Sequence, residues 1–138
     1  MKNIDKVLYK YPKAKIQIEI DNIKLEEIEN SLGDIKAYSY DNISVSSSNI
    51  NNSTEDAAIE LLHKKEEINK RIKYTTLFCN KIEKALQVLS NIERLIIESY
   101  YFQNVKDYEI YLDFSYGISK AVYYKTKKSA KEKIKNLI

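Results

Sequence analysis

The chain has 138 residues and a formal net charge of +3, with two Gly, one Pro, one Cys and one His. A length of this order fits one domain, or one small domain with an extended helical arm. The single Cys, Cys79, excludes an intramolecular disulfide, and the lone His leaves no Cys/His cluster for zinc. We predict neither a metal site nor a cofactor.

The sequence contains no run of about 18 apolar residues that could span a membrane. Its first residues also lack the apolar core of a signal peptide. We therefore expect a cytoplasmic protein with no membrane partner. Because Gly and Pro are so scarce, long helices are favoured over a β fold with many turns, and the predicted class is all-α.

Residues 2–32 are predicted to form a first helix, because apolar side chains recur at alternating steps of four and three. The pattern has one gap, at Asp21. Gly33 is expected to end this helix, and the Ser- and Asn-rich residues 33–53 are expected to form a mobile linker. The apolar positions of the stripe are Val7, Tyr11, Ala14, Ile18, Leu25, Ile28 and Leu32.

Residues 54–89 are predicted to form a second long helix that Ser53 or Thr54 caps. Its apolar seam alternates steps of three and four, as in a coiled coil. Two partners for this seam stay open: the first helix, giving an antiparallel hairpin over residues 1–89, or a second copy of the chain, giving a homodimer. The seam positions are Ala58, Leu61, Lys65, Ile68, Ile72, Thr75, Cys79, Ile82, Leu86 and Leu89.

Residues 90–138 are predicted to form a second domain of three short helices. Ser90 and Glu93 have the spacing of a capping box at the start of the first of these helices. Asp107 is expected to cap a short helix that contains Ile110. A turn with Gly117 then leads to a last helix capped by Ser119. This succession is the layout of a helix-turn-helix unit.

The last helix is strongly basic. Residues 119–138 contain seven Lys and one acid, a net +6, so the rest of the chain carries −3. A basic end on a mildly acidic body indicates a polyanion site, and we predict double-stranded DNA as the partner. The inward edge is expected to consist of Tyr123, Thr126, Ala130, Ile134 and Leu137, with Tyr124 at the surface. The predicted DNA contacts are Ser119, Lys120, Tyr124, Lys125, Lys127, Lys128 and Lys131.

Three segments resemble a known family. Residues 90–102, SNIERLIIESYYF, are similar to the "L-x-x-x-E-R-x-I-I-x-x-x-Y-F" stretch of sigma-70 region 4-like proteins. Residues 119–130, SKAVYYKTKKSA, resemble the recognition helix of ArpU/RinA-type phage regulators, "Y-S-K-S-x-Y-Y-R-x-K-x-x-A", and residues 107–111, DYEIY, resemble the "D-x-x-I-Y" of that family. Ile110 and Tyr111 lie about two residues further from Ser119 than in the family. Either the turn is longer or Leu112 is the anchoring residue.

The resemblance covers residues 86–138 well and the N-terminal helices loosely. It implies a phage or prophage regulator of late-gene transcription that works beside RNA polymerase in the bacterial host, and not an enzyme. A phage small terminase subunit is one alternative, because such proteins also combine a helix-turn-helix with helical oligomerisation segments. A helical adaptor that binds a protein and no DNA is another, suggested by the acidic body and the long seam.

Overall fold

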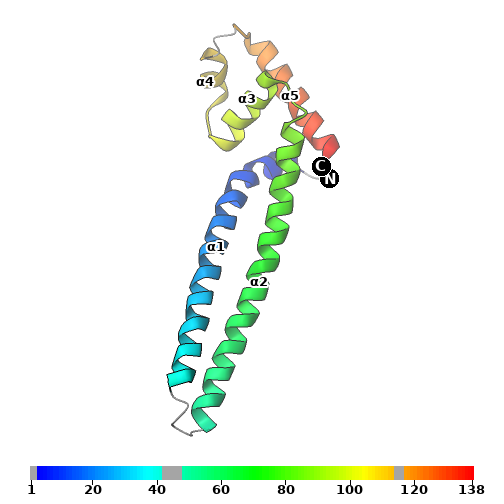
Figure 1. The fold of residues 1–138 in the computed structure, drawn as a ribbon. Helices are drawn as coiled ribbons and strands as arrows, with labels where there is room; N and C mark the ends of the chain where they lie inside the picture. The colour runs from blue at the N-terminus through cyan, green and yellow to red at the C-terminus, as the bar shows by residue number, and fades with distance from the viewer. Residues whose placement is uncertain (1–2, 42–47, 114–116) are drawn as a thin grey trace. The chain divides into compact units, whose positions relative to one another are not determined.

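The computed structural model describes the backbone of residues 3–41, 48–113 and 117–138, and the side chains of residues 3–36, 54–113 and 117–138. Every element in these ranges is helical, which confirms the predicted all-α class (Figure 1). In chain order the elements are α1 (Ile4–Asp41), α2 (Ser48–Leu86), α3 (Asn91–Ile97), the π-helical turn η1 (Glu98–Phe102), α4 (Asp107–Leu112) and α5 (Lys120–Leu137).

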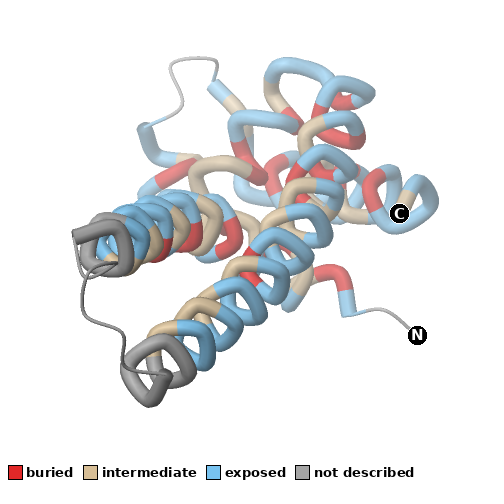
Figure 2. The backbone as a smooth tube through the Cα atoms, turned by 60° about the horizontal axis from the view of Figure 1, so that its bottom comes forward, coloured by how far each residue is buried: buried red, intermediate tan, exposed pale blue. Residues whose placement is uncertain are grey.

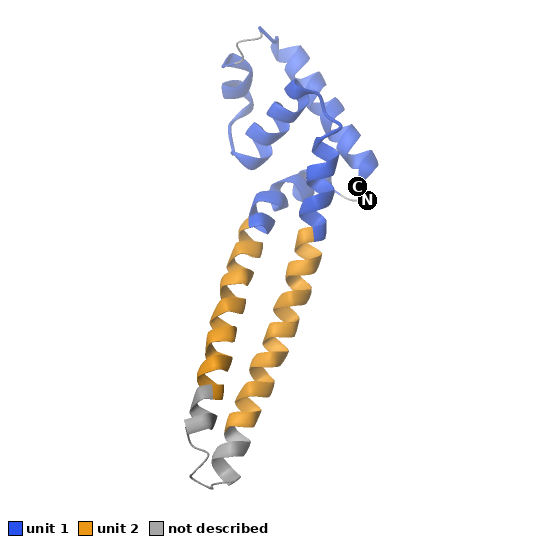
Figure 3. Ribbon diagram, in the orientation of Figure 1, with its two compact units in different colours: residues 1–15, 77–138 blue, residues 16–76 orange. Residues whose placement is uncertain are grey.

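The chain divides into two compact units (Figure 3). Unit 1 combines residues 1–15 with residues 77–138, and unit 2 consists of residues 16–76. This division differs from the predicted boundary at residues 89 and 90, because the first turns of α1 and the end of α2 belong to the same unit as α3, α4 and α5. The reason is a shared core, described below.

Unit 2 is an antiparallel helical hairpin. Asp21 of α1 pairs with Arg71 of α2, and Glu29, further along α1, pairs with Lys65, earlier in α2. Ile28 and Ile68 are buried along this seam, and exposed residues occupy the other side of each helix (Figure 2). Within the chain, the predicted seam of α2 is thus covered by α1, as the hairpin interpretation requires.

The ends of the two long helices differ from the prediction. Gly33 does not stop α1, which continues to Asp41, and α2 starts at Ser48 rather than after a cap at Ser53 or Thr54. The predicted linker is therefore helical at residues 33–41 and 48–53, and its middle, residues 42–47, lies outside the described residues. Gly in a helix interior costs about 1 kcal/mol, and the half-buried Ile35 in the added turn helps to offset this cost.

Unit 1 has its core where four segments meet. The fully buried side chains include Leu8 of α1, Ile82 of α2, Ile97 of α3 and Ile134 of α5. Burial of each such side chain away from water stabilises the folded state by about 1.5–3 kcal/mol. The start of α1 is therefore part of the C-terminal core, although it lies far from it in the sequence.

The helix α3 starts as the sequence predicts. The Ser90 hydroxyl oxygen accepts a hydrogen bond from the Glu93 amide at 3.2 Å, and the Glu93 carboxylate accepts one from the Ser90 amide at 3.1 Å. This capping box satisfies two amides that a helix start leaves without intrahelical partners. The helix then widens into η1 before Asn104, which has a left-handed φ of 57°.

A second, smaller core joins α3, α4 and α5. Ile96, Ile110 and Tyr123, one from each helix, pack together and are all buried. Leu112 is 72% exposed, so Ile110 and not Leu112 anchors α4 in this core. The predicted cap of α4 is wrong: Lys106 holds the cap position, and Asp107 is the first helical residue with its carboxylate directed to α5.

Candidate nucleic-acid interface

The start of α5 has an orderly local structure. The Ser119 hydroxyl oxygen accepts a hydrogen bond from the Val122 amide at 3.2 Å, as the sequence predicts for a cap. Gly117, two residues before it, has a φ of 67°, a backbone conformation that favours Gly. No acidic residue lies in the first turn, so the positive end of the helix dipole is not compensated there.

The two edges of α5 separate as predicted at most positions. Tyr123, Ala130 and Ile134 are fully buried, while Tyr124 is 43% exposed. Leu137 was expected inside, but it is 56% exposed. The cause is its place in the last turn of α5, where it lies over the end of α2 and lines an apolar groove instead of the core.

The outward edge of α5 carries cations on its N-terminal half. Lys120, Lys125 and Lys128 are exposed, and Tyr124 lies among them on the same edge. Among the described residues, no ion pair is formed by these three lysines, and the same is true of the exposed Lys135 near the end of the helix. Their charges are available to an external anion.

Lys127 has a different environment from the other predicted contacts. Its Nζ lies 2.9 Å from a carboxylate oxygen of Asp107 and 3.2 Å from the centre of the Tyr100 ring, and its side chain is only 12% exposed. The same Asp107 oxygen accepts a hydrogen bond of 2.6 Å from the Tyr123 hydroxyl. The prediction that Lys127 contacts DNA does not fit this position, because the ammonium group is enclosed between a carboxylate and an aromatic ring.

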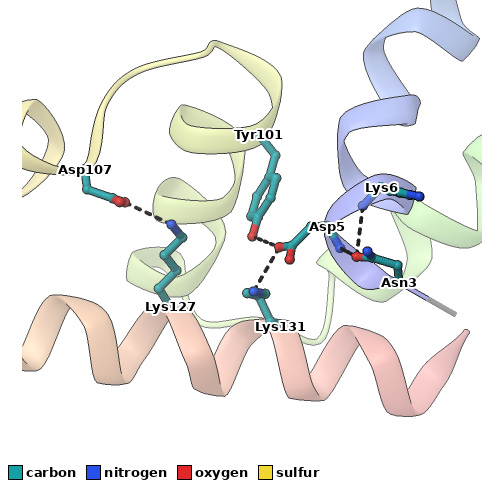
Figure 4. A network of polar contacts seen from close by, with 7 residues as sticks. All are labelled: Asn3, Asp5, Lys6, Tyr101, Asp107, Lys127 and Lys131. Carbon is teal, nitrogen blue, oxygen red and sulfur yellow. Dashed lines mark hydrogen bonds and ion pairs between the residues drawn. The ribbon is translucent and has the colours of Figure 1, made fainter. Parts of the chain in front are cut away.

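Lys131 is also engaged inside unit 1. Its Nζ lies 2.9 Å from a carboxylate oxygen of Asp5, to which the buried Tyr101 hydroxyl donates a hydrogen bond (Figure 4). Burial alone would raise the pKa of Asp5, but the bonds from Tyr101 and Lys131 and the charge of Lys127 hold it below its ordinary value. Burial and the Asp5 carboxylate raise the pKa of Tyr101. Lys131 thus fastens α1 to α5.

A third lysine of α5 is paired with the capping box of α3. Lys133 Nζ lies 2.9 Å from the Glu93 carboxylate, whose side chain is 7% exposed. Burial alone would raise the pKa of Glu93, but bonds from Lys133 and Ser90 lower it below its ordinary value. Glu93 Oε2 is buried and has no partner among the described residues. This pair strengthens the α3–α5 contact.

Of the predicted DNA-binding residues, the structure brings together Ser119, Lys120, Tyr124, Lys125 and Lys128 on one accessible surface, and it places Lys127 and Lys131 in internal ion pairs. The partners Asp5, Glu93 and Asp107 were not predicted for this role. Asp107 and Lys127 are 20 residues apart, and no periodicity connects them. We call the accessible set, Ser119, Lys120, Tyr124, Lys125 and Lys128, the outward surface of α5.

Within the described residues, no group of His, Cys, Asp and Glu side chains is arranged to hold a metal ion. Among the helices that the structure describes, none contains a stretch apolar enough to span a lipid bilayer. A comparison of the chain with protein-family models, curated proteins and solved structures finds no match.

Proposed function

We propose that the protein is a DNA-binding regulator of transcription and not an enzyme, and that the outward surface of α5 is its DNA-binding surface. The observation that carries the proposal is the separation of the two edges of α5. One edge is fixed by fully buried residues, and the opposite edge presents Lys120, Tyr124, Lys125 and Lys128 to solvent at a capped helix start.

This geometry suits the major groove of DNA. The groove admits one α-helix, provided that the helix is held by neighbours on its far side. In this chain α3 and α4 supply that support through Ile96 and Ile110, which contact Tyr123. The three helices would thus act as a helix-turn-helix, with α5 as the recognition helix.

The individual side chains have distinct roles in such a complex. Lysines neutralise phosphates and release counterions, which supplies affinity without sequence preference. Tyr124 can donate a hydrogen bond to a phosphate or touch a thymine methyl group. Ser119 and the amides of the first turn are suited to a phosphate at the helix start. With no Arg in α5, guanine recognition is weak, and a second protein is needed to add specificity.

The resemblance of residues 86–138 to ArpU/RinA-type regulators supports bacterial RNA polymerase as that second protein and late phage genes as the target. The sequence left open whether Ile110 or Leu112 anchors the helix before the turn. Ile110 lies in the core shared with α3 and α5. The longer segment between α4 and α5 is therefore compatible with an anchored α4. The site of action would be the cytoplasm of the bacterial host.

The test is a fluorescence-anisotropy titration against the DNA upstream of the gene and a scrambled duplex, over a range of salt concentrations. Each lost phosphate contact reduces the slope of log affinity against log salt by about 0.9. Lys125→Ala and Lys128→Ala should each do so. A matched control is Lys64→Ala with Lys70→Ala, since both are exposed lysines of α2.

The internally paired lysines provide a second control. Lys127→Ala should lower the thermal stability and leave the salt slope unchanged, because its charge is enclosed by Asp107 and Tyr100. If Lys127→Ala changed the slope as much as Lys125→Ala, the assignment of the outward surface would be refuted. No DNA binding by the wild type would favour the adaptor alternative, and a ring-sized oligomer on DNA would favour a small terminase subunit.

A further inference from the structure

The hairpin of unit 2 has a second apolar stripe, on the side of α1 away from the seam. Ile16, Ile20 and Ile23 are 56%, 41% and 56% exposed. They recur at steps of four and three, so they share one face of the helix. On the opposite face, Asp21 and Ile28 are buried against α2. Three isoleucines in one exposed row differ from apolar residues scattered singly over a surface, and such a row marks an interaction site.

We propose that this stripe pairs with the same stripe of a second copy of the chain, as a short parallel coiled coil. The steps place Ile16 and Ile23 at one core position of a heptad and Ile20 at the other. Glu19, just before Ile20, flanks the stripe on one edge, and Lys24, just after Ile23, flanks it on the other edge; both are exposed. In a parallel pair, a residue on the first edge faces the residue five positions later on the partner.

The charges therefore select both the partner and its direction. In a parallel pair, Glu19 of each copy faces Lys24 of the other, so the ion pair forms twice about the two-fold axis. A surface that is complementary to itself is what a symmetric dimer requires. An antiparallel pair centred on Ile20 would instead bring the two Glu19 side chains together, which is unfavourable.

The length of the stripe sets the strength of the dimer. One heptad before and after Ile20, the core positions hold Lys13 and Glu27, so the apolar contact extends over only about two turns. Such a contact is smaller than the roughly 1,200–2,000 Å² of a stable interface. We expect a dissociation constant in the micromolar range. If the proposed DNA binding holds, adjacent half-sites would raise the effective concentration and favour the dimer.

Sedimentation equilibrium of the full chain without DNA, from about 1 to about 300 µM, tests the proposal. The wild type should show a reversible monomer–dimer equilibrium. Ile20→Glu should stay monomeric over the same range. Ile59→Glu is the matched control, because Ile59 lies in α2 of the same unit, is 49% exposed and is not in the stripe. A wild type that is monomeric throughout, or equal effects of the two substitutions, would overturn the proposal.

Charge substitutions test the direction of the pair. Glu19→Lys and Lys24→Glu should each weaken the dimer, and the double variant should restore it, because the swapped charges face each other again. If the double variant stayed as weak as either single variant, the parallel arrangement would be wrong. DNA is absent from all of these measurements, so a negative result would refute the dimer and not the proposed DNA binding. Equally, a failure to bind DNA would not refute the dimer.

Discussion

Asp21 is a charged residue in the middle of an apolar seam, and its removal can be predicted in some detail. Its side chain has no exposure to solvent. Arg71 donates to both of its oxygens, at 2.8 and 2.6 Å, and Gln17 donates at 2.9 Å. Arg71 is 47% exposed. Without its partner, Asp21 would be a buried charge, whereas Arg71 could still be solvated by water.

The inequality sets an order of destabilisation. Arg71→Ala leaves a buried carboxylate with Gln17 as its described side-chain partner; such losses cost about 3–5 kcal/mol, and water entering at the exposed Arg71 position reduces this to about 2–3. Asp21→Ala leaves an arginine that reaches water, at a cost of about 1 kcal/mol. Asp21→Leu restores the apolar pattern and should be neutral or stabilising by about 1 kcal/mol.

Urea unfolding followed by circular dichroism at pH 7 measures these differences. Hydrogen exchange on the same variants should show lost protection within residues 16–76, the unit that contains both partners. Lys70→Ala, which removes an exposed cation one position away, is the control and should have little effect. The reasoning is refuted if Asp21→Leu is the most destabilising variant, because burial of the carboxylate would then be a net stabilising feature.

Three further outcomes follow from the same structure. Tyr123→Phe should lower the free energy of unfolding by about 1–2 kcal/mol in thermal melts, since its hydroxyl donates to Asp107 at 2.6 Å; an unchanged melting temperature would contradict this. Ala130→Leu should cost about 1–3 kcal/mol because Ala130 is fully buried, whereas the same change at the exposed Ser129 should be tolerated. Bonds from Arg71 lower the pKa of Asp21, so this group stabilises the fold above its ordinary pKa of about 4, and that contribution is lost as the pH falls below it. Asp21→Leu should flatten the acid limb of the stability–pH curve; an identical limb would argue against the assignment.

Much of this protein is determined by residues within one or two helical turns of each other. The alternating steps of three and four predicted the facing seams of α1 and α2 and the burial of Tyr123 beside an exposed Tyr124. The capping box at Ser90 and the cap at Ser119 were also readable, because a cap is a bond between residues three positions apart. The sequence also showed that Asp21 interrupts the first apolar stripe, but it did not show that Arg71 is the ion-pair partner of Asp21.

Only the tertiary structure decided which charges remain available. Lys125 and Lys127 look alike in sequence, but packing brings Asp107 and Tyr100 to Lys127 and leaves Lys125 exposed. Asp5 reaches Lys131 from the opposite end of the chain because Leu8, one turn further along α1, is fully buried in the same core. Periodicity and capping fix each helix and its faces locally. The pairing of charges instead depends on which helices the core brings together, and contacts between residues so distant leave no regular spacing in the sequence.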